Sequence, residues 1–290
     1  MSKKNIVIIG GGVSGLTSAI YLSRANFNVK VLTGYSYGLL SDSPLVENFP
    51  GFKDGISGFD LLNEIKEQAE KFGAEIIDDK AVNIDANRNL VLSDSDETYQ
   101  YDILIIATGT EPRKITAKNA DKYDNKNIHY CATCDGRLYK DKNVCVVGGG
   151  NTALTEALYL SDICKSVTIL IRKNKFKAEQ TLIDKVSKKS NIIVLFSTEI
   201  EECCGDNKLE KLIINTNDKL SSYLIDGIFV AIGSDRNDEI LKASFGESYN
   251  ISTMPENIKF CGDIIETKHQ AIIAAGSGAK VAMEIIENEY

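Results

Sequence analysis

One pattern occurs twice in this chain and constrains its fold more than any other feature. The apolar run Ile6–Ile9 leads into the glycine-rich turn Gly10–Gly15 and a helical stretch, and Val144–Val147 leads in the same way into Gly148–Ala153. A second apolar segment follows each helical stretch, so both regions have the order strand, helix, strand. Two such units predict an α/β protein with two doubly wound, Rossmann-like dinucleotide-binding domains.

Two further apolar strands indicate where these domains meet. Ile103–Gly109 and Ile228–Gly233 both end in Ala-x-Gly, and each is followed by a polar stretch suited to a linker. The simplest layout therefore inserts one domain in the other. Residues 1–114 and 239–290 then form a discontinuous first domain, and residues 115–238 form the inserted domain.

Composition and charge exclude several classes of protein. The chain has 290 residues and a net charge of −8, which argues against a nucleic-acid partner. No segment reads as a signal peptide or a membrane span, so we expect a cytoplasmic protein without a membrane partner. The seven cysteines show no paired framework, which fits a reducing compartment and favours a catalytic role for Cys131 and Cys134.

The first glycine-rich turn has the spacing of a dinucleotide-binding loop. Gly10 permits the tight turn, Gly12 lets the backbone approach a pyrophosphate, and Gly15 lets helix and strand pack closely. The acidic residue expected at the end of the next strand is replaced by Thr33, so ribose recognition is weaker or is supplied elsewhere. The expected contacts of this region are Gly10, Gly12, Val13, Ser14, Gly15 and Thr33.

The sequence Cys131-Ala-Thr-Cys134 is the candidate reactive centre. Two cysteines at this spacing can close a small disulfide ring, and the adjacent Asp135 can act as general acid or base for a thiol. Half of a zinc site and two inert buried thiols are the alternatives. A zinc site would need His129 or Cys203–Cys204, and neither has the usual ligand spacing, so no metal is expected.

Several motifs together resemble those of the low-molecular-weight thioredoxin reductases. The matching segments follow one another in the family's order along nearly the whole chain. The hexapeptide that begins at Cys131, placed just before the second glycine loop, is distinctive. The segments are Val46–Gly51, Ala107–Gly109, Tyr130–Gly136, Phe229–Gly233, Cys261–Asp263 and His269–Ala271.

This resemblance implies one FAD per chain in the discontinuous domain, a nicotinamide-type inserted domain that carries the dithiol, a homodimer, and thioredoxin as substrate. It also implies that Cys134 faces the flavin, that Cys131 attacks thioredoxin, and that Asp135 manages protons. Asp263 would hold the ribityl chain of FAD. Besides the contacts of the first glycine loop and Thr33, the implied FAD contacts are Asn48, Thr108, Gly109, Gly262, Asp263, His269, Gln270 and Ala271.

The electron donor is where the sequence departs from the family pattern. The family grips the 2′-phosphate of NADPH with His-Arg-Arg-x-x-x-Arg, whereas Ile171–Lys177 keeps one arginine and replaces two by lysine. Lysine lacks the planar fork that binds phosphate in a bidentate way. The family's Gly-Gly-Gln near the flavin is also changed, to Gly38-Leu-Leu after Tyr37. These departures resemble the ferredoxin-dependent flavin thioredoxin reductases of anaerobic bacteria, which favours reduced ferredoxin over NADPH.

Three other interpretations stay open at this point. The chain is an NADPH-dependent reductase if lysines suffice for the phosphate. It is a diflavin disulfide oxidoreductase if a second flavin occupies the altered nucleotide site, and a non-catalytic flavin redox sensor if it signals through conformation.

Overall fold

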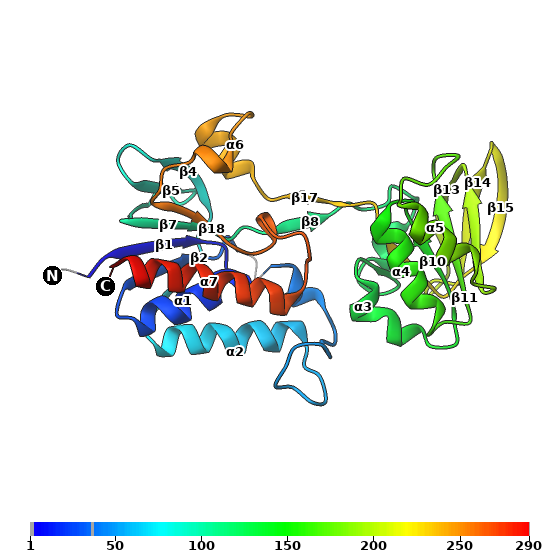
Figure 1. Ribbon diagram of the computed structural model, residues 1–290, viewed down its shortest axis with the longest axis horizontal. Coiled ribbons are helices and arrows are strands. Elements are labelled where there is room, and N and C mark those ends of the chain that lie inside the picture. The colour runs from blue at the N-terminus through cyan, green and yellow to red at the C-terminus, as the bar shows by residue number, and fades with distance from the viewer. Residues whose placement is uncertain (1–2, 36–37, 290) are drawn as a thin grey trace. The chain divides into compact units, whose positions relative to one another are not determined.

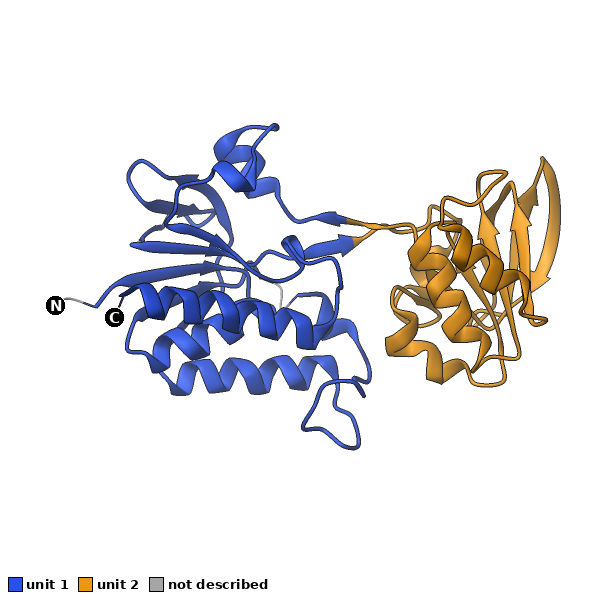
Figure 2. Cartoon of the chain, in the orientation of Figure 1, with its two compact units in different colours: residues 1–111, 235–290 blue, residues 112–234 orange. Residues whose placement is uncertain are grey.

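The computed structural model describes residues 3–35 and 38–289. The chain forms two compact units, one made of residues 1–111 and 235–290 and the other of residues 112–234 (Figure 2). The boundaries expected from the sequence lie a few residues further along the chain at both crossings. Each unit is built on a parallel sheet with helices, so the predicted fold class is confirmed.

The first unit has a five-stranded sheet in the order β18-β7-β1-β2-β3 (Figure 1). All its strand pairs are parallel, so the carboxyl ends of these strands lie at one edge. The strands are β1 (Asn5–Ile9), β2 (Asn28–Leu32), β3 (Glu75–Ile77), β7 (Ile103–Ile106) and β18 (Ile258–Phe260).

Burial on both faces explains why β1 is apolar from Ile6 to Ile9. Ile6 and Ile8 belong to a core shared with the helices α1 and α7, whereas Val7 and Ile9 belong to a second core on the other face. Successive side chains of a strand point to opposite faces, so a strand covered on both sides has no polar position. The helices of this unit are α1 (Val13–Arg24), α2 (Gly58–Lys71), α6 (Glu239–Phe245) and α7 (Ala271–Glu289).

Helices α1 and α7 approach each other closely. A Cβ on Gly278 of α7 would collide with the backbone carbonyl of Ser14 in α1, and the Ser18 hydroxyl donates to the Gly278 carbonyl at 3.0 Å. The remaining elements of the first unit are β4 (Ala81–Asp85), β5 (Leu90–Ser93), β6 (Thr98–Gln100), and the short 3₁₀ helices η1 (Leu39–Asp42), η4 (Ile251–Thr253) and η5 (Gly262–Ile264).

The two connecting segments pair with each other as β8 (Thr110–Pro112) and β17 (Ser234–Arg236). The second unit repeats the parallel architecture in the order β12-β11-β10-β16-β9, with an antiparallel sheet β13-β14-β15. Its sheet strands are β9 (Ile128–His129), β10 (Asn143–Val147), β11 (Ser166–Ile171), β12 (Ile192–Phe196) and β16 (Gly227–Val230). The antiparallel strands are β13 (Thr198–Cys204), β14 (Lys211–Thr216) and β15 (Lys219–Leu224).

Five helices complete the second unit. They are η2 (Ala120–Tyr123), α3 (Ala132–Asp135), η3 (Gly136–Tyr139), α4 (Asn151–Ser161) and α5 (Gln180–Ser187). Within residues 3–35 and 38–289, no helix is both long enough and apolar enough to cross a membrane. The expected cytoplasmic location stays a prediction.

Candidate functional site

The first glycine loop connects β1 to α1, and its three spaced glycines differ in their surroundings. Gly10 has φ +118°, and a Cβ there would collide with the carbonyl of Ala107. A Cβ on Gly15 would collide with the carbonyl of Gly10. At Gly12, by contrast, no described atom lies within 4 Å of the place that a Cβ would take. Packing therefore explains Gly10 and Gly15, whereas Gly12 faces open space at the start of α1.

This open space is suited to an anion. Gly12 is the N-cap of α1, no side chain among the described residues caps the helix there, and its first turn holds no acidic residue. The first backbone N–H groups of a helix have no partner within the helix, and the helix dipole favours negative charge at this end. The loop can therefore bind the pyrophosphate of a dinucleotide.

A carboxylate that the sequence did not reveal lies beside this loop. Thr33 follows β2 and packs against Gly11, and its hydroxyl donates to Asp78 Oδ1 at 2.7 Å. Asp78 follows β3, which pairs in parallel with β2, so both strands end at the same edge of the sheet. The acidic group missing from the end of β2 is thus supplied by the neighbouring strand. Pairing β2 with β3 from the sequence would have been needed to find it.

Asp263 provides a second carboxylate at the same edge, where η5 follows β18. Its Oδ1 atom is buried and has no hydrogen-bond partner among the described residues, and burial raises the pKa of this carboxyl. A buried oxygen without a partner costs free energy. Asp263 is therefore suited to accept a hydrogen bond from a ligand hydroxyl.

The other candidate contacts of the first unit lie at strand ends or at the start of α7. Asn48 Nδ2 donates to Gln270 Oε1 at 3.1 Å, which joins the Val46–Gly51 segment to the residue before α7. The Thr108 hydroxyl donates to the Asn237 carbonyl at 2.6 Å, so it helps to hold the connecting segments. The remaining candidates are Gly109 with φ +71°, Gly262 with φ +77°, the exposed His269, and Ala271, the first residue of α7.

The first unit thus brings together the sequence-predicted contacts that follow β1, β2, β7 and β18. A single open edge of parallel strands is the usual place for a nucleotide. Tyr37, the first residue of the altered segment, lies outside the described residues. Gly38 comes directly before η1 and has φ +81°.

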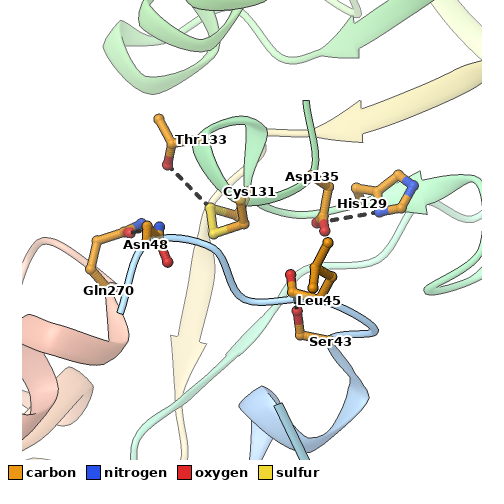
Figure 3. The surroundings of a disulfide bond; sticks show 9 residues. Ser43, Leu45, Asn48, His129, Cys131, Thr133, Asp135 and Gln270 are labelled. Carbon is orange, nitrogen blue, oxygen red and sulfur yellow. Dashed lines mark hydrogen bonds and ion pairs between the residues drawn. A yellow bond between two sulfur atoms is a disulfide. The ribbon is translucent and has the colours of Figure 1, made fainter. Parts of the chain in front are cut away.

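The candidate reactive centre lies in the second unit, at the start of α3. Cys131 and Cys134 are joined by a disulfide with their Cα atoms 5.3 Å apart. The Cys131 sulfur lies 3.4 Å from the Thr133 hydroxyl (Figure 3). The Asp135 backbone N–H donates to the Cys131 carbonyl at 3.1 Å, which fixes the acid next to the sulfur pair.

The buried side chain of His129 contacts the Asp135 carboxylate. His129 Nδ1 lies 3.3 Å from Asp135 Oδ2 (Figure 3), and His129 Nε2 lies 2.8 Å from the Tyr139 hydroxyl. The His129 side chain is 4% exposed. Sequence reasoning considered His129 only as a zinc ligand. Its contact with Asp135 depends on the short strand β9 and on the turn that follows, neither of which has a clear sequence signal.

A second carboxyl lies near the disulfide. Glu156 on α4 accepts a hydrogen bond from the backbone N–H of Ala132, and its Oε2 atom is buried without a partner among the described residues. Burial raises the pKa of Glu156 to about 7. The start of α3 is therefore held by a carboxyl that changes charge near neutral pH.

The second glycine loop has the same strained first glycine as the first loop, with φ +143° at Gly148. Its surroundings differ. The Lys177 N–H donates to the Gly149 carbonyl at 2.7 Å, and the Asn151 side chain bonds to both the backbone and the carboxylate of Glu179. Arg172, the arginine that remains of the phosphate-binding run, lies with Nε 3.8 Å from Glu199 Oε1. Two carboxylates, Glu179 and Glu199, thus lie beside the start of α4 and the remaining arginine.

Comparison with known proteins agrees with this geometry. The sequence profile of the pyridine nucleotide-disulphide oxidoreductases matches residues 4–288. Thioredoxin reductase from Streptomyces coelicolor is 35% identical, with 97% of this chain and 92% of that protein covered. Glucosaminate ammonia-lyase from Pseudomonas fluorescens is 34% identical, with 96% and 93% covered. The structure of thioredoxin reductase from Giardia duodenalis is 31% identical, covers 99% of both chains and has a TM-score of 0.86.

The chain therefore belongs to the pyridine nucleotide-disulphide oxidoreductase family. Within it, the full-length matches place the chain among the low-molecular-weight thioredoxin reductases. Membership of this family implies FAD as cofactor. The open N-terminus of α1 and the unpartnered Asp263 oxygen fit such a group.

The glycine loop generates the first prediction. Gly12→Ala should leave the fold intact, because Gly12 has φ −77° and open space around it, but its methyl group would stand in the anion site. We expect the Kd for FAD to rise by about tenfold or more, roughly 1.4 kcal/mol. Gly276→Ala is the matched control, since it also adds a methyl group in open space. Equal FAD affinity in both variants, measured by titration of the apoprotein, would contradict the assignment.

The buried carboxyl generates the second prediction. The pKa of Glu156 is higher in the folded protein than in the unfolded chain. The free energy of unfolding therefore falls as the pH rises from 4.5 to about 7, because the folded protein must then bury a charged carboxylate. Glu156→Gln should therefore raise the free energy of unfolding at pH 8 by about 1–3 kcal/mol, with little change at pH 5. Urea denaturation at the two pH values measures this. The exposed Glu210→Gln is the control and should show no such difference.

Proposed function

We propose that this protein is a flavin-dependent thioredoxin reductase in which the Cys131–Cys134 pair reduces the disulfide of thioredoxin. One observation carries the proposal. A closed disulfide with two-residue spacing lies next to an acid held by a buried histidine, in a chain that resembles thioredoxin reductases over its whole length. Bound FAD would supply the two electrons that open this disulfide.

The residues proposed to hold FAD all belong to the first unit. The glycine loop would bind the pyrophosphate through the N-terminus of α1, and Asp263 would accept a hydrogen bond from the ribityl chain. We add Asp78 as an acceptor for the adenosine ribose, because Thr33 holds its carboxylate at the end of β2. The other proposed contacts are Val13, Ser14, Thr33, Asn48, Thr108, Gly109, Gly262, His269, Gln270 and Ala271.

The chemistry of the reduced pair is thiol–disulfide exchange. The Cys131 thiol loses its proton and its sulfur bonds to one thioredoxin sulfur, while the other thioredoxin sulfur leaves and takes up a proton. The Cys134 thiol then loses its proton and attacks Cys131. This closes the Cys131–Cys134 disulfide and releases the second thioredoxin thiol. Asp135 receives and returns the protons in both steps.

We propose reduced ferredoxin as the electron donor. Arg172 is engaged with Glu199, and lysines replace the other two arginines of the NADPH grip, so the bidentate phosphate site is lost. A ferredoxin near about −400 mV would reduce a thioredoxin near about −270 mV with roughly 6 kcal/mol to spare for two electrons. The exposed Lys173, Lys175 and Lys177 suit an acidic partner.

The oligomer and location belong to the same proposal. As the family resemblance implies, we propose a homodimer in the cytoplasm.

The cysteine pair gives the third prediction. Cys131→Ser and Cys134→Ser should each lower thioredoxin reduction by at least about a thousandfold, because neither leaves a dithiol that can exchange. Both should still bind FAD, since its proposed contacts lie in the other unit. Cys204→Ser, which changes a half-buried free cysteine, is the control and should keep wild-type turnover. Turnover that survives in either of the first two variants would reject the reactive centre.

The donor gives the fourth prediction. Under anaerobic conditions, reduced ferredoxin should bleach the visible absorbance of bound FAD, and micromolar NADPH should not. Rapid bleaching by NADPH would refute ferredoxin dependence. The triple variant Lys173→Arg, Lys177→Arg, Glu199→Gln restores the fork and removes the competing carboxylate, so it should increase NADPH reduction while FAD content stays unchanged.

The same preparations separate the remaining alternatives. Two flavins released per chain on denaturation would identify a diflavin oxidoreductase. Flavin reduction without thioredoxin turnover, whatever the donor, would identify a redox sensor.

A further inference from the structure

Asp135 is the last residue of the short helix α3, and a specific partner contacts its side chain. The carboxylate is 14% exposed, and its Oδ2 atom lies 3.3 Å from His129 Nδ1. We propose that His129 is a positioning residue, which holds the Asp135 carboxylate in place for proton transfer during thiol–disulfide exchange. The inference rests on the proposed function and extends it to a residue outside the family motif.

The contacts of Tyr139 indicate which ring nitrogen of His129 carries the proton. The Tyr139 hydroxyl lies 2.8 Å from His129 Nε2, and burial raises the pKa of Tyr139 to about 12, so the hydroxyl keeps its proton at neutral pH. The Asn127 amide donates to the Tyr139 oxygen at 3.5 Å, and of the two acceptors within reach of the Tyr139 proton, His129 Nε2 at 2.8 Å is nearer than the Lys126 carbonyl at 3.4 Å. With Nε2 as acceptor, the ring proton is on Nδ1, the nitrogen that lies 3.3 Å from Asp135 Oδ2.

A doubly protonated imidazole would preserve this contact. Its Nε2–H would donate to the Tyr139 oxygen, whose own proton can go to the Lys126 carbonyl at 3.4 Å. Nδ1–H would still face the carboxylate. Nδ1–H of His129 therefore faces the Asp135 carboxylate in both of these forms of the ring.

Packing prevents the His129 ring from turning away. The ring stacks on Phe229, with centroids 5.5 Å apart and an interplanar angle of 28°, and Tyr139 meets it edge-on at 5.3 Å. His129 of β9 is paired in register with Phe229 of β16, so the stacked rings lie side by side in the sheet. A donor held by a sheet restricts the carboxylate more strongly than a surface side chain could.

The proton chemistry explains why such restraint matters. Each exchange step moves one proton from an attacking thiol to a leaving thiolate, and a general acid–base group must lie within hydrogen-bond reach of the sulfur atoms. His129 contacts Oδ2, which leaves the other carboxylate oxygen of Asp135 for this task. Without His129, the carboxylate would sample other rotamers, and proton transfer would become slower.

The test is a double-mutant cycle on the FAD-loaded enzyme, with thioredoxin as substrate. Asp135→Asn should lower kcat by roughly a hundredfold and His129→Ala by about tenfold, with KM for thioredoxin unchanged. In the Asp135→Asn background, His129→Ala should have no further effect on kcat, because its only route to the reaction is removed. His129→Asn should recover most of the lost rate, since its amide can donate in place of Nδ1–H.

Two results would overturn the inference while leaving the proposed function intact. One is an equal loss of kcat from His129→Ala with and without Asp135, which marks a general structural role. The other is a His129→Ala enzyme with wild-type kcat. The thermal midpoint and FAD content of each variant show whether a loss of kcat follows from misfolding. Absence of thioredoxin turnover in the wild-type enzyme would instead reject the proposed function itself.

Discussion

In the sheet of the first unit, β1 forms hydrogen bonds to β2 on one side and to β7 on the other, and both pairs run parallel. Parallel pairing brings the carboxyl ends of all these strands to one edge of the sheet, where a loop follows each strand. Because β1 is paired on both sides, a slip of its register would disrupt both ladders. The position of the glycine loop, and of every candidate contact beside it, depends on this pairing.

The second unit uses the same architecture for a different purpose. Its glycine loop has the strained first glycine of a nucleotide site, yet the segment after β11 bonds to the loop and brings Glu179 to Asn151. The reactive disulfide of this unit lies elsewhere, at the start of α3. The shared fold therefore does not determine what the second loop binds, and the charges around it decide the matter.

The sequence predicted the features that residue type alone enforces. Gly10 and Gly148 have positive φ angles and leave no room for a Cβ, so only glycine fits, and the repeated loops were visible in the sequence. The fold class followed from them. The contacts that define the sites were different, because they join residues brought together by tertiary structure. Asp78 is 45 residues from Thr33, and neither this pair nor His129 with Asp135 has a spacing that a sequence pattern could reveal.

The close contact between α1 and α7 has a consequence for the order in which the chain folds. The second unit is one continuous segment, whereas the first unit needs β18 and α7 from the end of the chain to cover β7 and α1. On the ribosome, the second unit can therefore fold while the apolar surfaces of β7 and α1 are not yet covered by β18 and α7. The first unit is therefore completed after the second, and its nucleotide edge forms only once β18 and α7 have been synthesised.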